Sequence, residues 1–318
     1  MKHLTTKLVV FILLLSMLLS ACTPATPAEP VTLKIAVLRI LDTLPMYVAQ
    51  QEGLFEAKGV KVEFIPAASA AERDQIITAG QADGMINEVV STILYNKDQV
   101  QIQIVRFART ATSTSSQYSI LASQQSGISA VEGLKGVEIG ISQGTIIEYI
   151  TDRLLQAEGL SPDEIKTIAV PKIDVRMNLL GTGELKAATL PDPFSSLALQ
   201  QGAVLVTDDT KHPQYGYSTI SFRKPVIDEH PQAIKAFLAA IEEATALVNA
   251  DPTKYENVLT EQKLIPAPLM GSYKFPPFPE ASVPSQDQWD DALAWMKSKG
   301  LVDKDVPYPD SINPSFLP

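Results

Sequence analysis

Strand-like and helix-like patterns alternate through the first hundred residues of the chain. Residues 31–38 (VTLKIAVL) and 60–65 (VKVEFI) show the period-two pattern of β-strands, and residues 45–58 show helical spacing that stops at Gly59. The same alternation predicts helices at 70–80 and 89–97 and strands at 84–87 and 102–107. Because strands that alternate with helices build parallel sheets, this part predicts a mainly parallel sheet flanked by helices.

A second α/β series follows Ser123. It predicts a helical turn at 131–134, helices at 145–158 and 175–181, and strands at 137–141, 167–170, 187–190 and 203–207. Two such series predict an α/β fold built from two units. The length of 318 residues agrees, since a domain has roughly 150 residues.

The last third of the chain is helical at both ends and rich in proline between them. An alanine-rich helix is predicted after Pro231, and a late helix at 285–298. Ser285 and Gln288 have the spacing of a capping box at the start of that late helix. Its apolar residues recur at helical spacing and are interpreted as a core-facing stripe: Trp289, Ala292, Leu293 and Met296.

The N-terminus has the pattern of a bacterial lipoprotein signal. Lys2 and Lys7 precede an apolar run that is shorter than the roughly 20 residues of a membrane span. The run ends in LSAC, which resembles a lipobox and contains the only cysteine of the chain, Cys22. The sequence therefore predicts a signal peptide at 1–21, then a lipidated cysteine and a proline-rich linker at 22–30. A plain signal peptide with an incidental cysteine is the alternative. Acyl chains on Cys22 would hold the body on the membrane, outside the cytoplasm.

Composition and charge exclude several classes of protein. Hydrophobic residues make up 45% of the chain, so a mostly disordered protein is excluded. The formal net charge is −10, which leaves no electrostatic footprint for nucleic acid. A single cysteine excludes an intramolecular disulfide and a cysteine-cluster metal site. No other motif for a metal or a cofactor is present, so neither is predicted.

Several segments, in order, are similar to one family. They are LPMYVA from Leu44, EGLF from Glu52, GVKVE from Gly59, GQAD from Gly80, GISAVEGLKGVEIGI from Gly127 and LPDPF from Leu190. This series resembles the periplasmic binding proteins of the nitrate/sulfonate/taurine and thiamine-pyrimidine group.

The resemblance implies the two-lobed type II periplasmic binding protein fold. Each lobe would be a mainly parallel sheet flanked by helices, and two hinge crossovers would join the lobes around a ligand cleft. Lobe 1 would comprise residues 31–118 and 218–318, and lobe 2 residues 119–217. The implied partners are a small-molecule ligand and an ABC permease with its ATPase subunits, and the protein itself would be a monomer. A ligand-sensing lipoprotein without a permease would have the same fold.

The candidate ligand-binding residues lie in loops that follow strands. In open α/β sheets, ligands bind beyond the carboxyl ends of the strands, where helix N-termini offer free N–H groups. Simple structural roles stay open, since Asp42 could cap a helix and Asp192 could be a turn residue. The candidates are Asp42, Thr43, Tyr47, Ser69, Asn87, Glu88, Ser142, Gln143, Gly144, Thr145, Glu148, Asp192 and Phe194.

One motif favours an enzyme instead. Residues 140–144 read G-x-S-x-G between a predicted strand and helix, as in the nucleophile elbow of α/β-hydrolases. Ser142 would then need Asp192 and a histidine, either His212 or His230. No HGGG-type oxyanion segment precedes the motif, and a glycine-serine turn at a helix N-terminus serves ligand binding equally well. We therefore expect no catalysis, with a serine hydrolase as an alternative.

Charge in the candidate loops guides the expected ligand. Four of the candidates are carboxylates, and together they would repel a sulfonate or a nitrate unless they were neutralised. Arg106, Arg109 and Arg176 could neutralise them, but Arg109 and Arg176 are expected to be solvated.

The favoured ligand is therefore a neutral or cationic heterocycle, such as a pyrimidine-like vitamin precursor. Tyr47, Phe194 or Tyr149 could stack on such a ring. An anion such as a sulfonate, taurine or nitrate is the alternative ligand.

Overall fold

The computed structural model describes residues 29–318. The predicted signal peptide, Cys22 and most of the linker lie outside the described residues, and the chain from Val31 to Pro318 forms one unit. Within the described part, no helix combines the length and the apolar character that crossing a bilayer requires.

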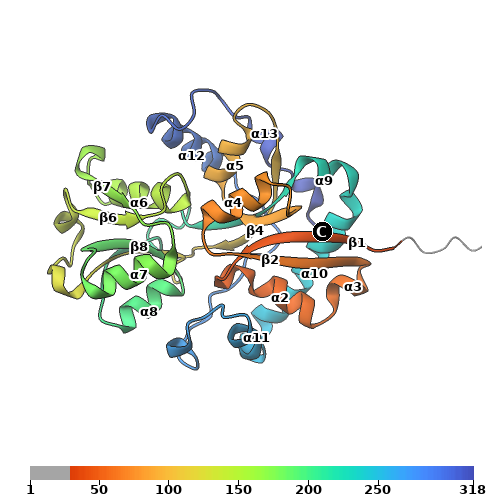
Figure 1. Ribbon diagram of the computed structural model, residues 1–318, viewed down its shortest axis with the longest axis horizontal. Helices are drawn as coiled ribbons and strands as arrows, with labels where there is room; N and C mark the ends of the chain where they lie inside the picture. Colours follow the sequence, from red (N-terminus) through yellow and green to blue (C-terminus); the bar gives the residue numbers. More distant parts are fainter. Residues whose placement is uncertain (1–28) are drawn as a thin grey trace, which may run out of the picture. The chain divides into compact units, whose positions relative to one another are not determined.

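The first sheet has five strands in the order β2-β1-β3-β10-β4 (Figure 1). Strand β1 pairs in parallel with β2 and β3, whereas β10 is antiparallel to its neighbours β3 and β4. The strands are β1 (Val31–Leu38), β2 (Val60–Ala67), β3 (Gly84–Asn87), β4 (Ile102–Thr110) and β10 (Tyr217–Arg223). The helices are α2 (Leu44–Gln51), α3 (Leu54–Ala57), α4 (Ala70–Thr78), α5 (Val89–Asn96), α9 (Lys224–Glu229) and α10 (Pro231–Ala250).

The second sheet repeats this plan in the order β7-β6-β8-β5-β9. Again one strand, β5, is antiparallel to both of its neighbours. The strands are β5 (Tyr118–Ala122), β6 (Glu138–Ile141), β7 (Lys166–Ala169), β8 (Ala187–Pro191) and β9 (Val204–Asp208). The helices are α6 (Ile146–Ala157), α7 (Ile173–Thr182) and α8 (Phe194–Gln200). Two flanked, mainly parallel sheets confirm the predicted fold class.

The chain passes between the two sheets twice, through residues 111–117 and 209–216. The strand after each passage, β5 or β10, is the antiparallel one of its sheet, and the sequence pattern predicted neither of them. Each follows another strand directly, without a helix between, so the strand–helix alternation gives no signal there. Within the unit formed by residues 31–318, Figure 1 shows the second sheet to the left of the first.

Glycine divides the helix that was predicted at 45–58. Gly53 has φ 67°, a left-handed conformation that ends α2 and lets α3 begin in a new direction. The remaining predicted helices and strands of the two sheets agree with the structure to within about three residues at each end.

The C-terminal segment contributes to the core through α12 (Gln286–Ser298). Both parts of its predicted capping box are present. The predicted apolar stripe is buried and joins one hydrophobic cluster with residues of α5 and α6. Trp289 Nε1 donates to the carbonyl of Val306, and Trp295 Nε1 donates to Asp152, so both indole N–H groups are satisfied. Two short helices, α11 (Glu256–Glu261) and α13 (Tyr308–Ser311), flank this segment in the sequence.

Substitution of Gly84 tests how tightly the first sheet is packed. A Cβ at Gly84 on the central strand would lie 2.7 Å from the Phe222 ring and 3.0 Å from the carbonyl oxygen of Ser221. We expect Gly84→Ala to lower the free energy of unfolding by about 1–3 kcal/mol, because a close-packed site must shift to admit the methyl group. The measurement is denaturant unfolding followed by circular dichroism.

Gly181→Ala is the matched control. Gly181 lies in α7 without a positive φ, and a Cβ added there would have no atom within 4 Å. Because alanine is the better helix former, this change should raise the free energy of unfolding by roughly 0.5–1 kcal/mol. Equal effects of the two substitutions would contradict the packing argument.

Candidate functional site

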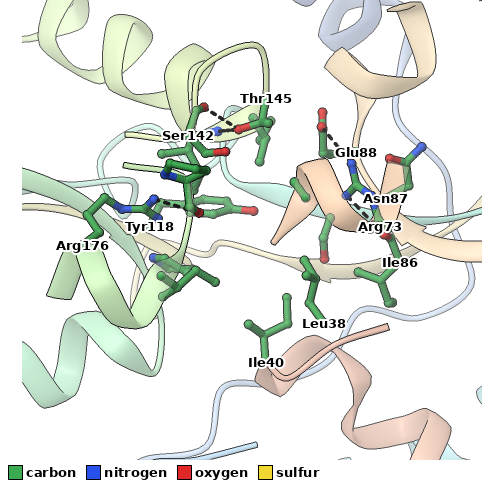
Figure 2. Close-up of a pocket in the computed structure, with 17 residues that line it drawn as sticks. Leu38, Ile40, Arg73, Ile86, Asn87, Glu88, Tyr118, Ser142, Thr145 and Arg176 are labelled. Carbon is green, nitrogen blue, oxygen red and sulfur yellow. Dashed lines mark hydrogen bonds and ion pairs between the residues drawn. The ribbon is translucent and has the colours of Figure 1, made fainter. Parts of the chain in front are cut away.

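A cavity of about 50 Å³ lies where the carboxyl ends of strands from both sheets meet (Figure 2). Leu38, Asn87 and Pro191 end β1, β3 and β8, and Ser142 follows β6 directly. Tyr118 and Ser218 reach it from the strands that follow the two passages between the sheets. We call this cavity the inner pocket. It lies where ligands bind in open α/β sheets.

Helix N-termini form part of the wall of the inner pocket. Glu88 is the N-cap of α5, and its Oε2 accepts from the backbone N–H of Ser91 at 3.1 Å. Thr145 is the N-cap of α6, where its Oγ1 accepts from the N–H of Ile147 and donates to the carbonyl of Ser142. Both residues line the pocket and are at most 5% exposed. Capping thus fixes these polar side chains at the pocket wall.

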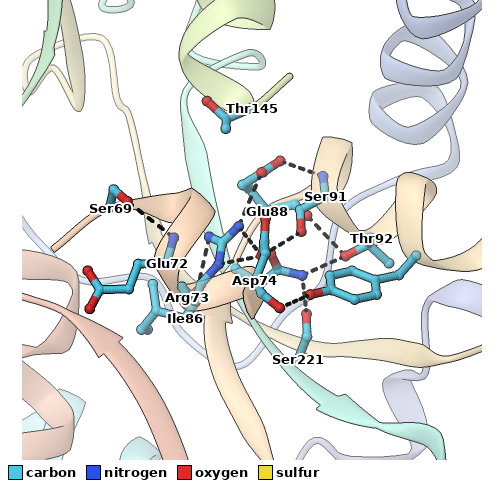
Figure 3. Close-up of polar contacts among 12 residues, drawn as sticks. Ser69, Glu72, Arg73, Asp74, Ile86, Glu88, Ser91, Thr92, Thr145 and Ser221 are labelled. Carbon is cyan, nitrogen blue, oxygen red and sulfur yellow. Dashed lines mark hydrogen bonds and ion pairs between the residues drawn. The ribbon is translucent and has the colours of Figure 1, made fainter. Parts of the chain in front are cut away.

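The first-sheet wall carries a buried arginine that the sequence analysis missed. Arg73 of α4 is 2% exposed, and its Nη2 lies 2.8 Å from Asp74 Oδ1 and 3.7 Å from Glu88 Oε1 (Figure 3). Its Nη1 donates to the carbonyl of Ile86. Burial raises the pKa of Glu88 to about 7, although the nearby Arg73 acts to lower it. The sequence contained one sign of this buried arginine. Arg73 lies near the N-terminus of α4, where the helix dipole disfavours a cation unless carboxylates surround it.

The second-sheet wall carries Arg176 of α7, which is fully buried and has no ion-pair partner among residues 29–318. Its Nε donates to the carbonyl of Thr189 at 2.8 Å, and its Nη1 donates to the carbonyl of Val170 at 2.7 Å. Burial lowers its pKa to about 10, a value at which the guanidinium stays charged at neutral pH. The expectation that Arg176 is solvated was wrong.

Four buried polar atoms that line the inner pocket have no hydrogen-bond partner in the described part of the chain. They are Arg73 Nη2, Arg176 Nη2, Glu88 Oε1 and Asn87 Oδ1. The Nδ2 of Asn87 is satisfied by Thr92 and Ser221, so the free Oδ1 is an acceptor. Buried polar groups are nearly always paired, so this concentration indicates a place for a ligand with both acceptor and donor atoms.

Asp42 and Asp192 lie in a separate network around Arg109. Arg109 is 1% exposed, and its guanidinium lies 3.7 Å from Asp42 Oδ1 and 3.2 Å from Asp192 Oδ2. Gln117 and Ser218 also donate to Asp42. The expectation that Arg109 is solvated was therefore wrong, and both carboxylates are occupied within the protein.

Ser196 and Tyr273 complete the network, since both donate to Asp192. Arg106, the third arginine considered from the sequence, pairs with Glu242 at 2.7 Å rather than with any of the loop carboxylates.

The other candidates divide between structural contacts and an outer cavity. Thr43 donates to the carbonyl of Ile40, Ser69 caps α4, and Glu148 accepts from the N–H of Gly144 and pairs with Lys299. Gln143 is exposed.

The aromatic candidates do not line the inner pocket. Tyr47 packs edge-on against Phe64, and Tyr149 donates to Asp291. Phe194 lines a second cavity of about 430 Å³, the outer cavity, which shares Leu38 and Ile173 with the inner pocket. Of the thirteen candidates, the inner pocket brings together Asn87, Glu88, Ser142 and Thr145.

The G-x-S-x-G segment has a packing role in this structure. A Cβ at Gly140 would lie 2.6 Å from Leu185 and 3.3 Å from Arg176 Cγ, so glycine here makes room for the arginine stem. Gly144 has φ 68°, which the turn into α6 requires. His212 lies 3.5 Å from Glu158, and Asp192 is occupied by Arg109. In the part of the chain described, no hydrogen bond joins the hydroxyl of Ser142 to a histidine.

No metal site is evident in this region of the protein. Across residues 29–318, no three His, Cys, Asp or Glu side chains are grouped so that they could hold a metal ion. The inner pocket offers charge and hydrogen bonding from its own side chains.

Comparisons with known proteins identify the family and the fold. The family described as "NMT1/THI5 like" matches residues 41–255. The chain is 28% identical over 154 residues to the "Putative aliphatic sulfonates-binding protein" of Escherichia coli (strain K12), and the match spans about half of each chain, 48%. It is 25% identical over 218 residues to the "Putative thiamine biosynthesis protein" of Haemophilus influenzae, with 67% of each chain covered.

The fold has solved counterparts. The alkanesulfonate-binding protein of Xanthomonas axonopodis pv. citri, bound to MOPS, superposes with a TM-score of 0.75 at 17% identity. The superposition covers 90% of this chain and 99% of that one. Together with the two five-stranded sheets, it identifies the fold as the type II periplasmic binding fold.

The buried carboxyl of Glu88 predicts a pH dependence of stability. Its pKa rises from an ordinary 4.5 to about 7 on folding, so the folded state binds the proton more tightly. The contribution of Glu88 to the free energy of unfolding must therefore fall by about 3 kcal/mol as the pH rises from about 4.5 to about 7. Above that range this contribution changes no further. Glu88→Gln should remove this part of the fall, as measured by denaturant unfolding between pH 5 and 8.

Asp209 and Glu56 define the controls for this measurement. Burial also raises the pKa of Asp209 to about 7, so a residual fall with pH should persist in Glu88→Gln. Glu56 is exposed on α3, and Glu56→Gln should keep the full dependence of the unsubstituted protein. An unchanged slope in Glu88→Gln would contradict the assignment.

Proposed function

The chain belongs to the NMT1/THI5-like family, and from this premise we propose that it is a solute-binding protein for a small organic anion, delivered to an ABC importer. The observation that carries the proposal is Arg176. A fully buried guanidinium without a carboxylate partner is costly, and its free Nη2 lines a pocket at the carboxyl ends of the strands. An oxyanion such as a sulfonate would supply both the missing charge and the missing acceptor.

This proposal replaces the heterocycle that charge counting favoured. That preference assumed four carboxylates facing the ligand without neutralisation. In the structure Asp42 and Asp192 share Arg109, Glu148 pairs with Lys299, and Glu88 lies near Arg73. The repulsion of an anion is therefore largely cancelled within the protein, and Arg176 remains unneutralised. The sulfonate-binding relative supports the same choice of ligand.

Location and partners follow from the same role. The LSAC segment and Cys22 support secretion and lipid anchoring, which would hold a monomeric receptor beside a permease and its ATPase subunits. We assign residues 31–118 and 218–318 to one lobe and 119–217 to the other, since the two sheets fall within these ranges apart from the first residue of β5, Tyr118, and of β10, Tyr217. Hinge motion at residues 111–117 and 209–216 would then close the lobes around the ligand.

Arg176→Gln tests the proposal directly. In the purified full chain we expect titration calorimetry to detect binding of short alkanesulfonates, and the substitution to weaken it by about 10- to 100-fold, as for loss of a charged hydrogen bond. Circular dichroism should show an intact fold. Nitrate and a hydroxymethylpyrimidine complete the panel of ligands.

Arg153→Gln is the matched control, because Arg153 pairs with Asp291 and does not line the inner pocket. It should bind the anions like the unsubstituted protein. Tight binding of the pyrimidine without any binding of anions would refute the proposal, as would full anion affinity in Arg176→Gln.

A further inference from the structure

One buried carboxylate near the passages between the sheets has no part in the inner pocket. Asp209 begins the second passage, residues 209–216, and it is fully buried. Arg109, the nearby cation, pairs with Asp42 and Asp192 instead. Because a buried carboxylate is costly unless hydrogen bonds satisfy it, the donors to Asp209 show what this residue holds in place.

The donors to Asp209 come from the other passage, residues 111–117, and from the residue that follows it. Oδ1 accepts from the backbone N–H of Gln117 at 2.9 Å, and Oδ2 accepts from the backbone N–H of Tyr118 at 3.0 Å. The backbone N–H of Asp209 in turn donates to the carbonyl of Tyr118. We call Asp209 with these three hydrogen bonds the clasp. Bonds to a charged acceptor are roughly twice as strong as neutral ones, so the clasp joins the two passages firmly.

The far end of the second passage leaves room for the same carboxylate. A Cβ at Gly216 would lie 1.9 Å from Asp209 Oδ2, so the carboxylate occupies the space that any other side chain would need. Ala111, which begins the first passage, donates its N–H to the carbonyl of Gly216 at 2.7 Å. The two passages are therefore joined at the end near each sheet.

The residues that adjoin the clasp reach the ligand site. Gln117 donates through Nε2 to Asp42 at 3.0 Å, and Tyr118 lines the inner pocket. Two residues after Gly216, Ser218 also lines the pocket and donates to Asp42. Asp209 thus fixes the backbone from which both passages present side chains to the pocket and to the Arg109 network.

We propose that Asp209 is a positioning residue of the hinge, and that its carboxylate makes the two passages bend as one. The inference rests on the hinge motion of the proposed function and assigns the control of that motion to a residue outside the inner pocket. Two passages that bent separately would let the halves twist and slide as well as close. Joined passages restrict the halves to closing about a shared axis, so less conformational entropy is lost when the closed form is reached.

Spin labels on the two halves test the inference. Lys61 on β2 and Lys166 on β7 are exposed on edge strands of the two sheets (Figure 1), and Lys61→Cys with Lys166→Cys in the full chain carrying Cys22→Ser provides the labelling sites. Double electron–electron resonance measures the distribution of distances between the labels at pH 8, above the pKa of about 7 that burial gives Asp209. We expect Asp209→Asn to broaden this distribution, because the amide replaces one acceptor oxygen with a donor that faces a backbone N–H.

Two further variants control this measurement. Asp208→Asn is the matched control, because Asp208 accepts from the N–H and the hydroxyl of Thr210 within its own turn. It should leave the distribution unchanged. Gly216→Ala should broaden the distribution as Asp209→Asn does, since the new methyl group displaces the carboxylate. The two changes combined should broaden it no more than either one alone, because both break the same contact.

The outcomes separate this inference from the proposed function. An unchanged distribution in Asp209→Asn and Gly216→Ala overturns the role of the clasp, as does an equal broadening in Asp208→Asn. For an anion that binds, we expect Asp209→Asn to raise the Kd by about 10-fold, because fewer molecules adopt the binding-competent form. If no anion binds, the proposed function fails, while the label distances still decide the role of Asp209.

Amide hydrogen exchange on the unsubstituted protein decides if the variants do not fold. The backbone N–H groups of Gln117 and Tyr118 should exchange far more slowly than that of Ser113, which lies at the exposed turn of the same passage. Exchange at Gln117 and Tyr118 as fast as at Ser113 would overturn the inference.

Discussion

Arg109 is the charge on which the arrangement of the two sheets depends. Its guanidinium is buried between Asp42, which follows β1, and Asp192, which follows β8. Each carboxylate belongs to a different sheet, and Gln117 and Ser218, near the two passages between the sheets, both donate to Asp42. A buried charge is costly unless it is paired and hydrogen-bonded, so each of these contacts depends on the others. Removing the arginine would leave two carboxylates uncompensated beside both passages.

The Arg109 network also explains why the neighbouring pocket is unusual. Asp42 and Asp192 neutralise the charge of Arg109, and Ser196 and Tyr273 donate to Asp192. The inner pocket adjoins this network through Ser218 and Pro191, yet Arg176 and Glu88 there keep unpartnered atoms. The chain therefore has the means to neutralise buried charge and does so around Arg109 but not around Arg176. That contrast is the physical argument for a ligand at Arg176.

Sequence pattern predicted the fold better than the site. Hydrophobic periodicity located most strands and helices, because burial on one face repeats along the chain. It missed β5 and β10, which follow other strands directly. It also misjudged Arg109 and Arg176, because a charged side chain gives no periodic signal of burial. Arg109 and Asp192 are 83 positions apart in the sequence, so no local pattern reveals their pairing. For Arg73 there was a local sign, because this cation lies near the N-terminus of α4 with carboxylates beside it in the sequence.

The distribution of unpartnered atoms over both halves of the inner pocket links ligand recognition to motion. Arg176 and Thr145 belong to the second-sheet half, whereas Asn87, Glu88 and Arg73 belong to the first. A ligand that contacts the unpartnered atoms of both halves is fully bound only when both halves approach it. Because a ligand shifts a conformational equilibrium only through its differential affinity for the two states, such a ligand would favour the closed form.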